Sequence, residues 1–262
     1  MDATTETLDL PQGKITVSRK GSGQQILLLH GGGGPVINLP FADALAENYE
    51  LISPVHPGYN GTPAPDHFDG MSDLVHFYLD VLDAIDIDNA ILIGFSMGGW
   101  LAAELASISC EKFSRLILVD AVGVKHGGPT DRDIADVFGL PGDKLAQIMW
   151  HDASKAPDPA DMTDEQMEMM AGNRIALALY TWEPYMHNPK LRHWLHRIDI
   201  PTLLIWGASD GLVPPDYGRK YAALIPGAKF VEIPEAGHSP QGEQPEKFVQ
   251  AVTQFVGEGA AS

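Results

Sequence analysis

The sequence predicts an α/β fold in which a mostly parallel sheet carries helices on both faces. Short apolar segments end at Gly, Pro or Asp, and helical patterns lie between most of them. The apolar segments do not alternate with polar residues, as is typical of strands buried on both faces. Strand–helix alternation with right-handed crossovers gives parallel pairing. The 262 residues suit one large domain, or a domain with one inserted piece.

Strands and helices are expected in both outer parts of the chain. The predicted strands are residues 14–20, 25–29, 50–53, 90–93, 115–119, 202–206 and 229–233. The predicted helices are residues 43–48, 72–85, 97–107, 216–223 and 245–256. Ser72 is a suitable N-cap for the second helix, and Pro245 suits the first turn of the last one.

The middle of the chain, residues 121–198, contains no convincing strand. Helical patterns occur there at residues 131–138, 142–150, 163–180 and 190–197. We therefore expect a core domain of residues 1–120 and 199–262, with residues 121–198 inserted as a helical cap. The methionines and tryptophans concentrated in this segment can line an adaptable apolar pocket, or they can form the core of the cap itself.

The formal net charge of −18 repels nucleic acid and anionic membranes, so neither is expected as a partner. We expect no signal peptide, no membrane span and a cytoplasmic location. The single cysteine, Cys110, excludes an intramolecular disulfide and suits a small buried residue. A homodimer is compatible with the sequence, which does not specify the oligomeric state. The C-terminal GEGAAS is expected to be a frayed tail.

The segment ILIGFSMGGW, residues 91–100, places one serine between glycines where a buried strand ends. It fits the pattern G-x-S-x-G, which holds a serine on a sharp, strained strand-to-helix turn. Side chains at Gly94 and Gly98 would collide with the neighbouring strand and helix. The helix N-terminus beneath Ser96 favours a developing negative charge. Taken alone, the pattern is also compatible with an ordinary turn of small residues.

Two polar turns that follow predicted strands supply a base and an acid. TLLIWGASDGLVPP carries Asp210, and KFVEIPEAGHSP carries His238. Because loops after parallel strands share one edge of the sheet, both side chains can meet Ser96. A serine nucleophile needs such a base, and the base needs an orienting acid. Asp120 also follows a strand and is the rival acid, although the context of Asp210 matches better.

These three segments resemble the nucleophile elbow, acid turn and histidine loop of the α/β-hydrolase superfamily with a helical cap. The resemblance extends from the strand before His30 to the last helix. It implies that Ser96 is the nucleophile, that His238 is general base and then general acid, and that Asp210 orients His238. The oxyanion hole would combine the Met97 N–H with a glycine N–H of HGGGGP. Gly32 is the first choice there, and Gly33 is the close alternative.

Several further residues are expected around the substrate. They are His30, Phe95, Met149, Trp150, Trp182, Met186 and Val213. His30 is interpreted mainly as a positioning residue. His56 departs from the acidic residue that many relatives carry in this loop, and a hydrogen-bonded loop histidine is the simpler interpretation.

A serine nucleophile implies acyl transfer to water, so the first hypothesis is hydrolysis of small to medium apolar carboxylic esters. GFSMGG and HGGGGP also resemble carbon–carbon bond hydrolases of the meta-cleavage type. Those enzymes usually carry Trp after the histidine, where this chain has Ser239. In that case Arg174 or Arg192 could hold a substrate carboxylate. A lactonase, a thioesterase and a ligand-binding receptor that uses this fold are further alternatives.

Neither a cofactor nor a metal is expected. The glycine runs lack the G-x-G-x-x-G spacing of a dinucleotide site, and HGGGGP lacks the Gly-Lys-Ser/Thr ending of a phosphate loop. The chain has no HExxH, and the pair His193 and His196 suits a solvated helix face. The expected partner is therefore a small-molecule ester.

Overall fold

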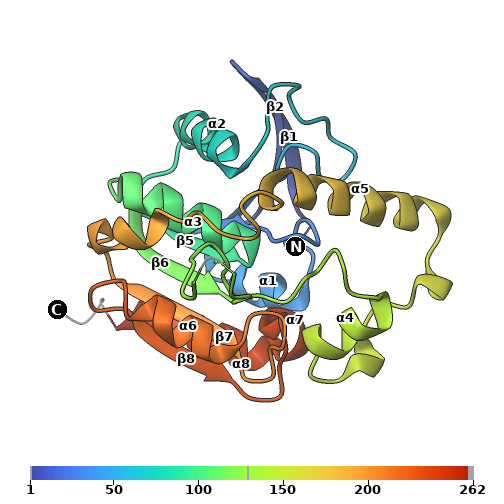
Figure 1. The fold of residues 1–262 in the computed structure, drawn as a ribbon. Coiled ribbons are helices and arrows are strands. Elements are labelled where there is room, and N and C mark those ends of the chain that lie inside the picture. Colours follow the sequence, from blue (N-terminus) through green and yellow to red (C-terminus); the bar gives the residue numbers. More distant parts are fainter. Residues whose placement is uncertain (1, 129, 259–262) are drawn as a thin grey trace.

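The computed structural model describes residues 2–128 and 130–258, and within them eight strands form one sheet (Figure 1). The strands are β1 (Thr4–Leu10), β2 (Gly13–Gly21), β3 (Gln24–Leu29), β4 (Tyr49–Pro54), β5 (Ala90–Phe95), β6 (Phe113–Val119), β7 (Thr202–Gly207) and β8 (Lys229–Ile233). Their order is β1-β2-β4-β3-β5-β6-β7-β8. The β1–β2 and β2–β4 pairs are antiparallel, and the others are parallel. The predicted α/β architecture is confirmed.

Helices cover both faces of this sheet. They are α1 (Pro40–Leu45), α2 (Met71–Ala84), α3 (Met97–Ile108), α4 (Gly142–Met149), α5 (Asp164–Thr181), α6 (Pro215–Ala222), α7 (Pro240–Glu243) and α8 (Pro245–Gly257). One buried cluster joins α1 and α8 to the sheet, and a larger one joins α2, α3 and α6 to the opposite face. Along β3, Ile26 and Leu28 enter the first cluster, while Leu27 and Leu29 enter the second. This alternation explains why the central strands are continuously apolar.

No strand of the main sheet lies in the described part of residues 121–198. This segment, called the insertion below, holds α4, α5 and four short 3-10 turns, at Ala153–Lys155, Pro159–Asp161, Leu191–His193 and Leu195–Arg197. In Figure 1, α5 and α4 extend to the right of the sheet, with α5 above α4. None of the helices in the described residues has the length and apolar character needed to cross a bilayer.

Two helices predicted in the insertion are not formed as expected. Residues 131–138 form no helix. They contain a bend at 133–134 and the start of a turn at 137, and Asp131, Asp133 and Asp136 accept hydrogen bonds from nearby backbone N–H groups, for example Gly128 N at 2.7 Å from Asp131. Such local bonds compete with helix formation. Residues 190–197 form two 3-10 turns instead of one helix.

Several boundaries also differ from the prediction. Strand β1 was not predicted, because it is a largely exposed edge strand without an apolar run. Helix α1 begins at Pro40 rather than at residue 43. The N-cap of α2 is Gly70 rather than Ser72, and the carboxylate of Asp73 accepts the Gly70 N–H at 3.2 Å. The predicted start of α8 at Pro245 is confirmed. Residues 259–262 of the expected frayed tail lie outside the described residues.

Candidate active site

Ser96 lies at the turn between β5 and α3 with φ +50° and ψ −113°. This is a sparsely populated backbone conformation for a residue other than glycine. The neighbouring glycines make the turn possible, since a Cβ at Gly94 would lie 2.3 Å from the Gly98 carbonyl oxygen. A Cβ at Gly98 would lie 2.1 Å from the Leu29 carbonyl oxygen. The Ser96 N–H donates to the Val119 carbonyl at 2.8 Å, which holds the turn against β6.

The structure brings Ser96, His238 and Asp210 together in one hydrogen-bonded chain. Ser96 Oγ lies 2.9 Å from His238 Nε2, and His238 Nδ1 lies 2.7 Å from Asp210 Oδ2. The side chains of His238 and Asp210 are almost completely buried, whereas Ser96 is half-buried. Each residue follows a different parallel strand, at the edge where the sequence places them.

The carboxylate of Asp210 is held by its own turn. Its Oδ1 accepts the N–H groups of Leu212 and Val213, both at 2.9 Å. Together with His238, three N–H donors share its two oxygens. Asp210 Oδ2 is an acceptor only, so Nδ1 of His238 carries the hydrogen and the lone pair of Nε2 is directed at Ser96.

Asp120, the rival acid, lies nearby but makes no hydrogen bond to His238. Its Oδ1 accepts the N–H of Gly207 at 2.9 Å. Burial, followed by the neighbouring Asp210 carboxylate, raises the pKa of Asp120 well above its usual range. The geometry therefore pairs His238 with Asp210.

The glycine loop after β3 runs beside Ser96. A Cβ at Gly31 would lie 3.1 Å from the Ser96 Cβ, and the loop is closed by a hydrogen bond from Gly34 N to the Gly31 carbonyl. Within residues 2–128 and 130–258, the N–H groups of Gly32, Gly33 and Met97 have no hydrogen-bond partner. Met97 is the first residue of α3. These N–H groups are therefore not used by other groups of the described residues.

His30 and His56 form a buried network beneath this loop. The ring of His30 lies 2.8 Å from the Gly31 carbonyl through Nδ1, and its Nε2 accepts the His56 N–H at 3.1 Å. His56 Nε2 lies 2.9 Å from the His30 carbonyl, and its Nδ1 lies 2.5 Å from the Tyr78 hydroxyl. The carbonyl acceptors require His30 to be protonated at Nδ1 and His56 at Nε2.

Both histidines of this network are neutral. Burial lowers the pKa of His30 to about 4 and lowers that of His56 well below its usual value. The simpler interpretation of His56, a hydrogen-bonded loop histidine, agrees with these contacts. His30 holds the glycine loop through the Gly31 carbonyl.

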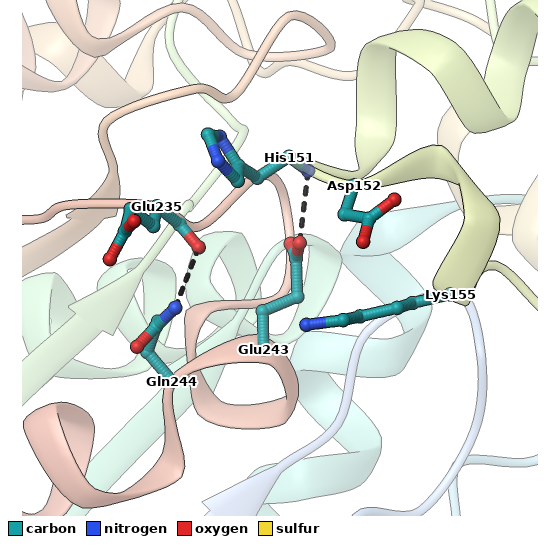
Figure 2. A pocket seen from close by; sticks show the side chains of 6 residues that line it. All are labelled: His151, Asp152, Lys155, Glu235, Glu243 and Gln244. Atoms are coloured by element: carbon teal, nitrogen blue, oxygen red, sulfur yellow. Dashed lines mark hydrogen bonds between the residues drawn. The ribbon is translucent and has the colours of Figure 1, made fainter.

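The insertion contacts the other side of the site through the end of α4. The N–H of His238 donates to the Met149 carbonyl at 2.6 Å, and the N–H of Gly211 donates to the Ile148 carbonyl at 2.8 Å. Glu243 accepts the N–H of Gly237 at 2.7 Å and that of His151 at 2.9 Å. Figure 2 shows the Glu243 carboxylate directed at the backbone of His151. Sequence reasoning missed Glu243, because nothing in the pattern around it distinguishes it from a surface acid.

A pocket of about 430 Å³ lies beside the histidine loop (Figure 2). Its lining is polar and contains none of the three residues of the hydrogen-bonded chain. The lining residues are His151, Asp152, Lys155, Glu235, Glu243 and Gln244.

The residues expected around the substrate are found in different places. Phe95 packs against Phe41 and Phe248 in the core between α1 and α8. Met186 is buried, and Val213 is buried with its N–H bound to Asp210.

Met149 and Trp150 are half-buried at the end of α4. Trp182 is 60% exposed and contacts Phe138. Two insertion residues that the sequence did not single out lie against the glycine loop. A Cβ at Gly32 would lie 2.8 Å from Leu177, and Asn173 Nδ2 donates to the Gly33 carbonyl at 3.2 Å.

The chain is similar to known proteins over most of its length. A model of the Alpha/beta hydrolase family matches residues 26–251. The 2-hydroxy-6-oxononadienedioate/2-hydroxy-6-oxononatrienedioate hydrolase of Burkholderia vietnamiensis is 30% identical over 268 residues, which cover 93% of this chain and 91% of that protein. A protein of the same name from Paraburkholderia phymatum is 28% identical, with 98% of this chain and 96% of that protein covered.

Solved structures share the fold. A meta-cleavage product hydrolase from Pseudomonas fluorescens IP01 has a TM-score of 0.75 at 23% identity, with 97% of this chain and 98% of that chain covered. An esterase from Thermogutta terrifontis has a TM-score of 0.75 at 21% identity, with 98% and 99% covered. The family model spans most of the sequence, and the predicted fold is the one observed. The chain is therefore a hydrolase that belongs to the alpha/beta hydrolase family.

Proposed function

We propose that this protein is a serine hydrolase that cleaves carboxylic esters of small to medium apolar substrates through an acyl-enzyme. The observation that carries the proposal is the hydrogen-bonded chain from Ser96 Oγ through His238 to Asp210. A serine hydroxyl is a weak nucleophile on its own, and an adjacent imidazole oriented by a carboxylate activates it.

The contacts support the following roles in acylation. His238 Nε2 takes the Ser96 proton while Oγ attacks the ester carbonyl, and Asp210 stabilises the imidazolium that forms. The N–H groups of Met97 and Gly32 donate to the oxyanion, with Gly33 as the alternative donor. His238 then gives its proton to the departing alcohol. In the second half, water deprotonated by His238 releases the acid and restores Ser96.

The contacts of Arg174 and Arg192 support an uncharged substrate. Arg174 Nη2 donates to the Val137 carbonyl at 2.6 Å, and Arg192 Nη1 donates to the Lys125 carbonyl at 3.3 Å. Both guanidinium groups considered for a substrate carboxylate are thus engaged with the backbone. Leu177 presents an apolar side chain to the glycine loop, which suits an apolar acyl or alcohol group.

A carbon–carbon bond hydrolase is the second candidate, and the names of the relatives favour it. Those relatives are named for a dienedioate or trienedioate, which carries two carboxylates. The same serine, histidine and oxyanion donors would serve that reaction. The two candidates differ in the need for cationic groups that bind the carboxylates.

The test compares p-nitrophenyl acetate, butyrate and octanoate with a 2-hydroxy-6-oxo-dienedioate, from about pH 5 to about pH 9. We expect repeated turnover of the esters, a preference for one chain length, and a loss of at least about 10³-fold in Ser96→Ala. A higher kcat/KM for the dienedioate would assign the protein to the second candidate. Binding without turnover of either class would favour the receptor-like alternative, and a series of lactones tests the lactonase.

A further inference from the structure

Asp120 is a buried carboxyl group that the proposed mechanism does not use. It follows β6 with φ +44° and is 1% exposed. Its Oδ1 accepts the Gly207 N–H, but Oδ2 is buried and has no hydrogen-bond partner among residues 2–128 and 130–258. An ionised oxygen without a donor is unfavourable in a site shielded from water.

The groups that face Asp120 are mostly acidic. Asp120, Asp210 and His238 each place one side-chain oxygen or nitrogen within 4.8 Å of the others. The negative charge of Glu243, on α7, also acts on Asp120. His238 is the one basic side chain of this cluster, and its Nδ1 is already bonded to Asp210 at 2.7 Å. Burial, then Asp210, and less strongly Glu243 raise the pKa of Asp120, while the Gly207 N–H opposes them.

The hydrogen-bond donors decide which of the two acids is ionised. Asp210 accepts three N–H groups, from Leu212, Val213 and His238. Asp120 accepts one, from Gly207. Two neighbouring buried carboxyl groups do not both ionise readily, and donors favour the charged form. The charge therefore belongs on Asp210 and the proton on Asp120.

Building on the proposed function, we propose that Asp120 is a neutral carboxylic acid that faces the Asp210 carboxylate and limits this pair of acids to one negative charge beside His238. Within residues 2–128 and 130–258 the Asp120 side chain makes no hydrogen bond to Ser96 or His238, so its role is that of a positioning residue that acts through Asp210. Its proton stays on Oδ2 throughout the reaction. The histidine then interacts with one carboxylate in a fixed geometry.

This proposal makes a kinetic prediction. Asn has the shape of a protonated Asp and the same absence of charge, so Asp120→Asn is expected to keep kcat/KM within about threefold and to leave the pH midpoint unchanged. If Asp120 were ionised, the same substitution would remove a negative charge close to His238. The midpoint would then fall by about one unit.

The protonation state is measured directly by ¹³C NMR on protein labelled at the aspartate carboxyl carbons. The Asp120 signal is assigned by its loss in Asp120→Asn, and Asp120→Ser gives a second assignment if the first variant folds poorly. We expect this signal at the carboxylic-acid position at neutral pH. In Asp210→Asn, where the competing charge is absent, its titration should move to lower pH.

An Asp120 signal that titrates below about pH 5 with the surface aspartates would overturn the proposal. So would a titration that Asp210→Asn leaves unchanged, or a midpoint lowered by a unit in Asp120→Asn. The NMR readout needs no substrate. A neutral Asp120 in a protein that cleaves no ester would therefore refute the proposed function while retaining the assignment of the proton.

Discussion

The insertion meets the candidate active site at two places that are held by different kinds of contact. The end of α4 binds the loops of Asp210 and His238 mainly through backbone groups, with the Ile148 and Met149 carbonyls as acceptors. Helix α5 binds the glycine-loop side through side chains. Asn173 Oδ1 accepts the Asn60 N–H at 2.8 Å, and the Tyr180 hydroxyl donates to the Pro57 carbonyl at 2.8 Å.

This difference indicates which changes each side tolerates. Backbone contacts depend on the path of the chain, so at the α4 end only substitutions that displace the chain should matter. Side-chain contacts can be removed one at a time, so the α5 side should weaken gradually. The outer surface of α5 has no such role and exposes apolar side chains. Those most exposed are Met169, Met170 and Ile175.

The largest expected effect is that of Gly237→Ala, at the α4 contact. A Cβ there would lie 2.1 Å from the Met149 carbonyl oxygen and 2.9 Å from the His151 nitrogen. Neither backbone atom can move without displacing the His238 loop, so we expect a loss of about 3 to 5 kcal/mol in the free energy of unfolding. The kcat of the variant molecules that do fold should be at least about 100-fold lower than that of the wild type.

Gly142→Ala is the matched control, since it lies at the start of the same helix and a Cβ there meets nothing within 4 Å. We expect it to be neutral or slightly stabilising. Urea unfolding and ester kinetics measure both variants. Equal behaviour of the two alanines would show that the α4 contact is not rigid.

The second effect is a loss of stability at low pH, caused by the two buried histidines beneath the glycine loop. The pKa of His30 is about 4 in the folded protein and about 6.5 in the unfolded chain. Between these two pH values the unfolded chain binds more protons than the folded protein. The free energy of unfolding is therefore unaffected by His30 above about pH 6.5 and decreases as the pH falls towards 4. The loss amounts to about 3 kcal/mol for His30. His56 acts in the same direction.

Asp120 opposes this trend, because its raised pKa makes the folded state bind an extra proton and favours folding at lower pH. The free energy of unfolding is therefore best measured between about pH 7 and about pH 4.5 in both the wild type and Asp120→Asn. We expect the free energy of unfolding to decrease in both proteins as the pH is lowered, and to decrease more steeply in Asp120→Asn. A flat profile in Asp120→Asn would contradict the neutral histidine network.

Next in size is Asn173→Ala, on α5. It removes the acceptor for the Asn60 N–H and the donor to the Gly33 carbonyl at 3.2 Å, in a side chain that is 5% exposed. Loss of buried hydrogen bonds should cost about 2 kcal/mol of stability. Because the glycine loop is loosened, kcat should fall severalfold. Ile175→Ala, at a side chain that is 73% exposed, is the control and should stay within about 0.5 kcal/mol.

The sheet and the positions of Ser96, Asp210 and His238 could be predicted from the sequence, for a local reason. Each lies in a short segment after an apolar strand, and parallel strands bring their carboxyl ends to one edge. The insertion was predicted less well. The helix expected at residues 131–138 is absent, and three aspartates there bind nearby backbone N–H groups instead. The spacing of apolar residues does not indicate such local hydrogen bonds.

The supporting contacts could not be predicted at all, since they depend on how distant segments pack. Leu177 lies against Gly32 across 145 positions of sequence, which no local pattern encodes. Phe95 was wrongly expected near the substrate for the opposite reason, its nearness in sequence. It neighbours Ser96 in sequence, but alternation along β5 directs its ring into the core with Phe41.

The smallest of these effects tests a side chain, Glu243, that supports the α4 contact. Glu243 Oε1 accepts the N–H of Gly237, and Oε2 accepts the N–H of His151. Figure 2 shows the second of these bonds. In Glu243→Gln an amide nitrogen must face one of these donors, which loosens the residue before His238 while leaving the substrate position untouched. We expect kcat to fall about tenfold, equivalent to about 1.4 kcal/mol, with little change in KM. Glu235 lines the same pocket, and among the described residues its carboxylate meets only Lys247, at 3.4 Å, so Glu235→Gln should keep wild-type activity. If both variants lost activity equally, the pocket's overall charge would be the cause, and the bond to Gly237 would have no special part in holding His238.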